Sequence, residues 1–208
     1  MVALAAIILA GGRSSRMGHD KALISLGAET LIERLCRVAS ACAEAVYVVT
    51  PWGDRYRPLV ATSVTFISEN PGVDPSQKPP GPVVALVQAL EQIQTDPAIN
   101  PEWVLLLACD LPNVSAAVLQ TWRDQLAKLS PDALAYLPQR QGRWEPLCGF
   151  YRTSALADLQ RYVAAGGRSF QPWLNTQTVA PIALTAQTEA MLTNLNTPAD
   201  LAQWQKGS

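Results

Sequence analysis

A stretch near the amino terminus joins a strand pattern to a glycine turn. Residues 2–9 form an unbroken apolar run, and Gly11 and Gly12 follow almost at once. Such a run is typical of a parallel strand that is buried on both faces. Glycines lack a Cβ atom, so backbone N–H groups can approach an anion closely at this turn. We therefore expect the turn to hold an anion such as a phosphate group.

Three cationic side chains follow the two glycines. Arg13 and Arg16 carry guanidinium groups that can grip phosphate oxygens with paired hydrogen bonds, and Lys21 is a compact point charge. Two widespread phosphate loops do not fit, because no glycine completes G-x-G-x-x-G and Ala22 stands where a P-loop has Ser or Thr. The alternative is a simple turn with solvated cations.

A carboxylate stands at the end of a second strongly apolar segment. Residues 103–108 predict a buried strand, and Asp110 comes directly after it. Ligands of open α/β sheets bind beyond the carboxyl ends of the strands, where the glycine turn and Asp110 would both lie. A carboxylate there suits Mg²⁺, which prefers oxygen ligands. From its position alone, Asp110 could equally form a cap or a turn.

The predicted elements mostly alternate between strand and helix. Further strands are expected at 45–50, 64–67, 133–137, 147–151 and 178–182, and helices at 29–43, from 82 onward, and at 115–129, 154–164 and 198–205. The neighbouring strands 133–137 and 147–151, joined by a polar turn, depart from this alternation. We therefore expect a three-layer α/β fold with a mostly parallel sheet and a small antiparallel portion. Residues 68–80 predict a long functional loop, and residues 1–208 a single domain.

Composition argues against several classes of protein. The 208 residues include 16 Lys and Arg against 17 Asp and Glu, whereas nucleic-acid binders usually carry a strongly basic face. No apolar stretch approaches the ~20 residues that span a bilayer, and no signal peptide is recognised. The four cysteines are scattered without a C-x-x-C pair. We expect a cytoplasmic protein that binds neither nucleic acid nor membrane.

The motifs together resemble a known family. The run from Leu9 to Lys21 is similar to the signature of the molybdenum cofactor guanylyltransferases and their nucleotidyltransferase relatives. Four further motifs agree with it: Gly81-Pro82, Cys109-Asp110-Leu111-Pro112, Glu145-Pro146-Leu147 and Asn194-Leu195-Asn196-Thr197-Pro198. The resemblance implies a Rossmann-like nucleotidyltransferase fold. It also implies Mg²⁺-dependent transfer of GMP from GTP to the phosphate of molybdenum-bound molybdopterin, with pyrophosphate leaving.

The same resemblance implies roles for individual residues. Lys21, Arg16 and Asp110 are the expected catalytic residues, and Asp110 is also the expected Mg²⁺ ligand. The expected nucleotide-binding residues are Leu9, Ala10, Gly11, Gly12, Arg13, Ser14, Lys21, Glu69 and Asp110. The acceptor phosphate, with a second pKa near ~6, already carries its attacking charge at neutral pH. A general base is therefore not required.

The acceptor side leaves two interpretations open. The resemblance places Glu145, Asn194 and Asn196 along the molybdopterin, whose edge could exchange hydrogen bonds with amides. Alternatively, these residues are structural: Thr197 would be the N-cap of a helix, and Glu145 would pair with Arg143 across a turn.

The nucleotide preference is tied to the first glycine. Cytidylyl relatives typically have alanine there, and the missing Cβ of Gly11 would leave room for a purine. Three residues depart from the guanylyl pattern, namely Thr50, Val83 and Ala85, so the base pocket could be built differently. The rival functions are a cytidylyltransferase, a sugar-1-phosphate nucleotidyltransferase, and a non-catalytic chaperone that binds nucleotide or cofactor. Expected partners are GTP and molybdopterin, with transient contacts to molybdoenzymes or other proteins of cofactor synthesis.

Overall fold

The computed structural model describes residues 2–11, 20–69 and 81–207. The strands are β1 (Leu4–Leu9), β2 (Ser25–Leu26), β3 (Glu29–Thr30), β4 (Ala45–Thr50), β5 (Val64–Ser68), β6 (Trp103–Ala108), β7 (Ala135–Arg140), β8 (Arg143–Trp144), β9 (Cys148–Arg152) and β10 (Val179–Ile182). The α-helices are α1 (Leu31–Ser40), α2 (Gly53–Tyr56), α3 (Pro82–Thr95), α4 (Ala116–Arg123), α5 (Leu156–Ala164), α6 (Phe170–Leu174), α7 (Ala186–Met191) and α8 (Pro198–Gly207). Short 3₁₀ turns include η1 (Lys21–Leu23) and η3 (Leu126–Lys128).

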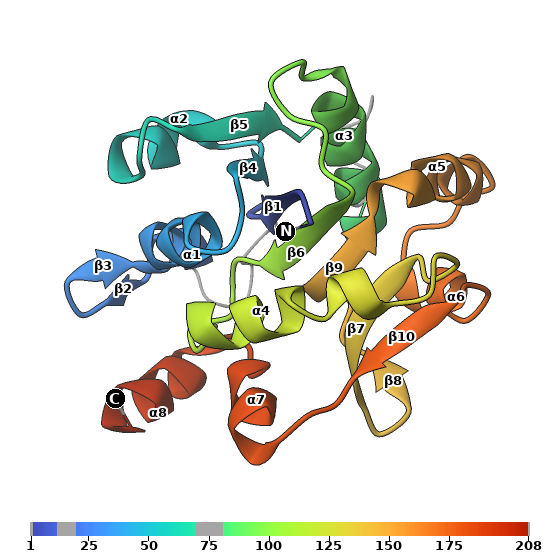
Figure 1. The fold of residues 1–208 in the computed structure, drawn as a ribbon. Helices are drawn as coiled ribbons and strands as arrows, with labels where there is room; N and C mark the ends of the chain where they lie inside the picture. The colour runs from blue at the N-terminus through green and yellow to red at the C-terminus, as the bar shows by residue number, and fades with distance from the viewer. Residues whose placement is uncertain (1, 12–19, 70–80, 208) are drawn as a thin grey trace.

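One large sheet runs through the protein in the order β10-β7-β9-β6-β1-β4-β5, with β8 paired to β7 (Figure 1). The pairs of β1 with β4 and β6, of β4 with β5, and of β10 with β7 are parallel. Strand β9 lies antiparallel to both β6 and β7. The predicted fold, mostly parallel with a small antiparallel portion, is confirmed.

The order of the parallel strands creates a switch point beside β1. From β1 the chain moves outward to β4 and β5, and after α3 it returns to β6 on the opposite side of β1. Open α/β sheets bind their ligands in the crevice at such a reversal, beyond the carboxyl ends of the strands. The segments after β1 and β6 therefore meet where a ligand site is expected.

Helices bury both faces of the sheet. Successive residues of β1 alternate between two cores, with Ile8 facing α1 and α4 and Ile7 facing α3, and both side chains are 0% exposed. Helices α5 and α6 share the α3 side, and Figure 1 shows the sheet between the two groups of helices. This two-sided burial explains why the central strands read as continuous apolar runs.

Several predicted boundaries needed correction. The helix expected at 29–43 begins at Leu31, because Glu29 and Thr30 pair with β2 and Thr30 caps the helix in a capping box with Glu33. The helix expected at 115–129 ends at Arg123 and is followed by η3. The short helices α2, α6 and α7 were not predicted, since four to six residues are too few for a helical period to show.

Within the part of the chain that the structure describes, no helix combines the length and the apolar character needed to cross a bilayer.

Candidate functional site

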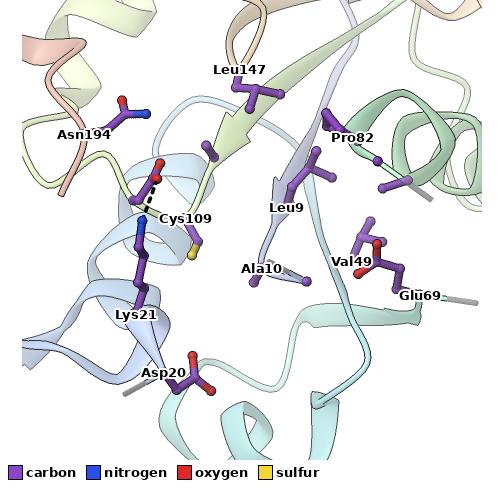
Figure 2. Close-up of a pocket in the computed structure, with 15 residues that line it drawn as sticks. Leu9, Ala10, Asp20, Lys21, Val49, Glu69, Pro82, Cys109, Leu147 and Asn194 are labelled. Atoms are coloured by element: carbon purple, nitrogen blue, oxygen red, sulfur yellow. Dashed lines mark hydrogen bonds and ion pairs between the residues drawn. The ribbon is translucent and has the colours of Figure 1, made fainter. Parts of the chain in front are cut away.

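A cavity of about 350 Å³ opens at the switch point (Figure 2). The first residues after β1 and β6 contribute to its wall, and so does the first turn of α3. Its lining residues are Leu9, Ala10, Gly11, Asp20, Lys21, Val49, Glu69, Gly81, Pro82, Ala85, Ala108, Cys109, Asp110, Leu147 and Asn194. Figure 2 shows Lys21 and Glu69 on opposite sides of the pocket, with Leu9 and Ala10 between them. Segments far apart in the sequence thus converge on one cavity.

Lys21 carries the positive charge of the described part of this pocket. Its ammonium nitrogen Nζ lies 3.3 Å from Oδ2 of Asp110 and donates a hydrogen bond of 2.8 Å to Oδ1 of Asn196. The Lys21 side chain is 17% exposed and that of Asp110 is 19% exposed, so this ion pair is partly shielded from water. Lys21 therefore joins the strand-end carboxylate to the segment that precedes α8.

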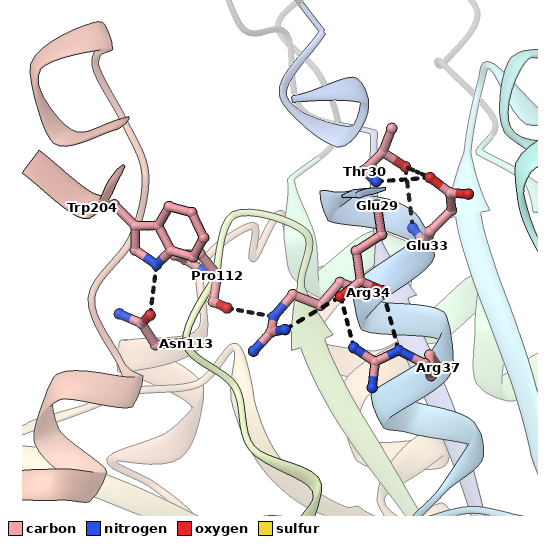
Figure 3. A network of polar contacts seen from close by, with 8 residues as sticks. All are labelled: Glu29, Thr30, Glu33, Arg34, Arg37, Pro112, Asn113 and Trp204. Atoms are coloured by element: carbon pink, nitrogen blue, oxygen red, sulfur yellow. Dashed lines mark hydrogen bonds and ion pairs between the residues drawn. The ribbon is translucent and has the colours of Figure 1, made fainter. Parts of the chain in front are cut away.

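The loop that carries Asp110 is held from two helices. Arg34 of α1 donates from Nε to the carbonyl oxygen of Pro112 at 2.7 Å, and Trp204 of α8 donates from Nε1 to Oδ1 of Asn113 at 2.7 Å (Figure 3). The N–H of Leu195 also donates to the carbonyl oxygen of Asp110 at 2.9 Å. These contacts come from different elements, so the backbone around Asp110 is held from several sides.

The carboxylate of Asp110 fits a divalent metal ion. Its Oδ1 atom is buried and has no hydrogen-bond partner among the described residues. A buried oxygen of this kind normally has a partner, and an unpartnered one needs an explanation. Mg²⁺ usually binds one or two carboxylates, with phosphates and water completing its shell. A single carboxylate with one open oxygen at the edge of a cavity matches this pattern.

Glu69 approaches the backbone at Gly11. An ideal Cβ atom on Gly11 would lie 1.5 Å from Oε2 of Glu69, so only glycine leaves this side chain where it is. The sequence led us to expect that a purine would use the space of the missing Cβ, whereas here the Glu69 carboxyl group takes it. Burial raises the pKa of Glu69 above its ordinary value. This carboxyl group is therefore easier to protonate than an exposed one.

The three residues expected on the acceptor side are not equally placed. Asn194 lines the main pocket, and Asn196 contacts Lys21. Glu145 instead lines an adjoining cavity of about 90 Å³, which it shares with Asn194. Its expected pairing with Arg143 is wrong, because Oε1 of Glu145 lies 2.6 Å from Nε of Arg140.

The structural interpretation of Thr197 is confirmed. The N–H of Asp200 donates to Oγ1 of Thr197 at 3.2 Å, which makes Thr197 the N-cap of α8. Asp200 in turn accepts the backbone N–H groups of Asn196 and Thr197, both at 2.8 Å, and these bonds lower its pKa. The start of α8 is therefore built around the residue that contacts Lys21.

Some expected site residues lie outside the described ones, namely Gly12, Arg13, Ser14 and Arg16. Other lining residues were missed by sequence reasoning. Asp20 precedes Lys21 in the motif from Leu9 to Lys21, and Pro82 begins the helix that the sequence predicts. Their positions could therefore have indicated that they line the pocket. Cys109 directly precedes Asp110, and burial raises its pKa to about 12, which keeps the thiol neutral near pH 7. For Val49 the sequence predicted a strand position and gave no indication that the side chain would line the pocket.

Comparison with known proteins agrees with this architecture. A protein of Trichormus variabilis named "Probable molybdenum cofactor guanylyltransferase" is 46% identical over 199 residues, which cover 96% of this chain and 89% of that protein. A protein of the same name from Synechococcus elongatus is 41% identical and covers 97% of this chain and 96% of its own length.

Solved structures show the same fold at lower identity. Molybdopterin-guanine dinucleotide biosynthesis protein A from Archaeoglobus fulgidus superposes with a TM-score of 0.73 at 22% identity, covering 96% of this chain and 95% of that chain. A nucleotidyl transferase from Methanothermobacter thermautotrophicus has a TM-score of 0.69 at 21% identity, and the match covers 99% of this chain and 97% of that chain. Residues 6–180 match the MobA-like NTP transferase domain. The family that the sequence resembles is thereby confirmed, and the chain belongs to the family of MobA-like NTP transferase domains.

Proposed function

We propose that this protein transfers GMP from GTP to the phosphate of molybdopterin, with release of pyrophosphate. One observation carries the proposal: Lys21 and a carboxylate with an open oxygen, Asp110, meet in a pocket at the switch point of the sheet. The relatives named as guanylyltransferases, which align over nearly the whole chain, support the choice of nucleotide and acceptor. We also propose that residues 1–208 act as one domain.

Both reactants of this transfer are anions, so the main obstacle is electrostatic repulsion. Lys21 would hold the triphosphate and stabilise the charge that builds on the leaving pyrophosphate. Arg16 would add positive charge at the phosphates, and Gly12, Arg13 and Ser14 of the same sequence motif would contact the nucleotide. Since the acceptor phosphate already carries its attacking charge near pH 7, no residue has to remove a proton.

Nucleotidyltransferases of this family typically use a divalent metal ion. We propose Mg²⁺, with Asp110 as its protein ligand, because oxygen donors and a partly open site suit this ion. When bound, it would supply Lewis-acid polarisation and charge neutralisation at the phosphates. The Lys21 ammonium group forms an ion pair with Asp110, which places two opposite charges side by side in the pocket.

The remaining walls of the pocket suggest how the two substrates are divided. Leu9, Ala10, Gly11 and Glu69 would contact the nucleoside on the β1–β4–β5 side. Asn194 and Asn196, with Glu145 in the adjoining cavity, would face the molybdopterin. Lys21 contacts Asp110 and Asn196, and this place beside the strand-end carboxylate suits a residue that acts on the reacting phosphates.

The test is pyrophosphate release by purified protein supplied with molybdopterin, Mg²⁺ and either GTP or CTP. For Asp110→Asn we expect turnover to fall by about a thousandfold, because the replacement keeps the shape but removes the charge on the metal ligand. Asp158→Asn, on the surface of α5, is the matched control and should turn over like the wild type.

Three outcomes would contradict the proposal. Unchanged turnover in Asp110→Asn would exclude the metal role of this carboxylate. Faster turnover with CTP would make the protein a cytidylyltransferase. Tight binding of GTP without any pyrophosphate release by the wild type would favour a non-catalytic chaperone.

A further inference from the structure

Two pocket residues, Ala10 and Asp20, receive hydrogen bonds from side chains of neighbouring elements, the end of β4 and helix α2. Ala10 is bound by Thr50, and Asp20 is bound by Tyr56. We propose that Tyr56, acting through Asp20, is a positioning residue for Lys21 in nucleotide transfer. This inference rests on the proposed function, in which Lys21 contacts the triphosphate.

Tyr56 is fully buried and donates its phenolic O–H to Oδ2 of Asp20 at 2.7 Å. The other carboxylate oxygen, Oδ1, accepts the backbone N–H of Ala22 at 3.1 Å and thereby caps η1. Both oxygens of Asp20 are therefore engaged: Oδ2 by Tyr56 and, at 4.0 Å, by the exposed guanidinium group of Arg55, both from α2, and Oδ1 by the turn that contains Lys21. Because Lys21 is the next residue along the chain, the place from which its side chain starts is set by this carboxylate.

Thr50 completes the arrangement on the other side. Its hydroxyl group, 1% exposed, donates to the carbonyl oxygen of Ala10 at 3.0 Å and accepts the N–H of Trp52 at 3.1 Å. Ala10 lines the same pocket as Lys21. Thr50 at the carboxyl end of β4 and Tyr56 of α2 thus orient two walls of the pocket through buried hydroxyl groups, neither of which lines it.

The contribution of Tyr56 can be separated from simple packing. Hydrogen bonds to charged groups are stronger than those between neutral groups. Losing this one leaves Oδ2 of Asp20 with the longer contact to the exposed Arg55, so the carboxylate and the turn behind it are held less firmly. Replacement by phenylalanine keeps the buried ring and removes only the donor. Packing of α2 should therefore survive in Tyr56→Phe while Lys21 loses its fixed starting point.

The chain offers a matched control in Tyr47. Tyr47 lies in β4, is 2% exposed and donates its phenolic O–H to Oδ2 of Asp96 at 2.8 Å, so Tyr47→Phe deletes the same kind of bond from a neighbouring element. Neither Tyr47 nor Asp96 lines the pocket. If Tyr56 has a purely structural role, Tyr56→Phe and Tyr47→Phe should change kcat/KM and melting temperature to the same extent.

The experiment compares both variants of the full chain with the wild type in steady-state turnover of GTP and in thermal unfolding. We expect Tyr56→Phe to lower kcat/KM for GTP about tenfold, the size expected for one lost bond to a charged group. Tyr47→Phe should keep the wild-type kcat/KM, although both variants lose melting temperature to a similar extent. Equal kcat/KM values in the two variants would overturn the proposal.

A second readout does not depend on activity. An amine-reactive acetylating reagent, followed by peptide mass spectrometry, measures how fast Lys21 is modified relative to Lys128, which lies in η3 and serves as internal reference. We expect faster modification of Lys21 in Tyr56→Phe only. If the wild type shows no GTP turnover, the proposed function fails, and this labelling still decides whether Tyr56 positions Lys21. An unchanged Lys21 rate would overturn the positioning role.

Discussion

Two carboxyl groups in the pocket differ because their surroundings differ. Asp110 lies 3.3 Å from the Lys21 ammonium group, with which it forms an ion pair. Glu69 packs against the backbone of Gly11 in a half-buried position, where burial raises its pKa. The wall proposed to contact the nucleoside therefore holds a carboxyl group that protonates readily, and the wall proposed to contact the phosphates holds one that is paired with Lys21.

The raised pKa of Glu69 predicts how stability depends on pH. Its folded-state pKa lies above the unfolded one, so the unfolded chain loses this proton first and stability declines as pH rises between the two values. Glu69→Gln has no charge to bury. The difference in unfolding free energy between this variant and the wild type, in favour of the variant, should therefore be smallest at about pH 4 and largest at about pH 7. Urea unfolding at both pH values measures the difference. The exposed Glu189→Gln is the control, and an equal pH trend in both variants would refute the burial argument.

At the scale of elements, the site depends on how helices hold the loop after β6. Arg34 and Arg37, one turn apart on α1, both contact Glu29, but only Arg34 reaches the carbonyl oxygen of Pro112 (Figure 3). Trp204 of α8 holds the next residue of the loop, Asn113. The position of Asp110 is therefore set by helices from the two ends of the chain.

This arrangement predicts different effects for two similar substitutions. Arg34→Met should cost about 1 kcal/mol of unfolding free energy, because it leaves the Pro112 carbonyl without its donor. It should also raise the Mg²⁺ concentration needed for half-maximal turnover, because the loop that carries Asp110 is held less firmly. Arg37→Met removes a side chain that is 61% exposed and should cost less than about 0.5 kcal/mol, with the Mg²⁺ dependence unchanged. Denaturant unfolding and Mg²⁺ titration of pyrophosphate release measure both effects. A larger loss in Arg37→Met would contradict this explanation of the loop.

At the scale of the molecule, the parallel and antiparallel portions share one sheet through the pairing of β6 with β9. Gly149 of β9 lies opposite Leu106 of β6 at this junction. An ideal Cβ atom on Gly149 would lie 2.6 Å from Cδ2 of Leu137 and 2.9 Å from the carbonyl oxygen of Tyr136. The close approach of β7 to β9 therefore requires glycine at this position.

The pairing of β6 with β9, and the close packing at Gly149, predict that the parallel and antiparallel portions unfold together. Gly149→Ala should cost about 1–3 kcal/mol through overpacking, whereas Gly53→Ala, whose Cβ would meet Phe66 at an ordinary 3.5 Å, should change stability by less than about 1 kcal/mol. If residues 1–208 form one cooperative unit, circular dichroism and tryptophan fluorescence should report the same transition in every variant. Separate transitions for the two probes would show that the antiparallel portion unfolds independently.

The sequence by itself determined the central strands, the start of α3 and the positions of two site residues at strand ends. Strands β1, β4 and β6 appear as apolar runs because both faces of the sheet are buried, and α3 begins at the predicted Pro82. Gly11 and Asp110 follow their strands as expected. The family was predicted from motifs spread over the chain, and the comparisons confirm it.

Only the tertiary structure decided which side chains meet. Lys21 contacts Asp110 and Asn196 across 89 and 175 positions of the chain, and Tyr56 reaches Asp20 from a four-residue helix that no periodic pattern reveals. Glu69 fills the space beside Gly11 only because β5 lies at that edge of the sheet. Hydrophobic periodicity indicates whether a residue is buried. Which residues it contacts depends on strand order and helix packing, because these bring together segments that lie far apart in the sequence.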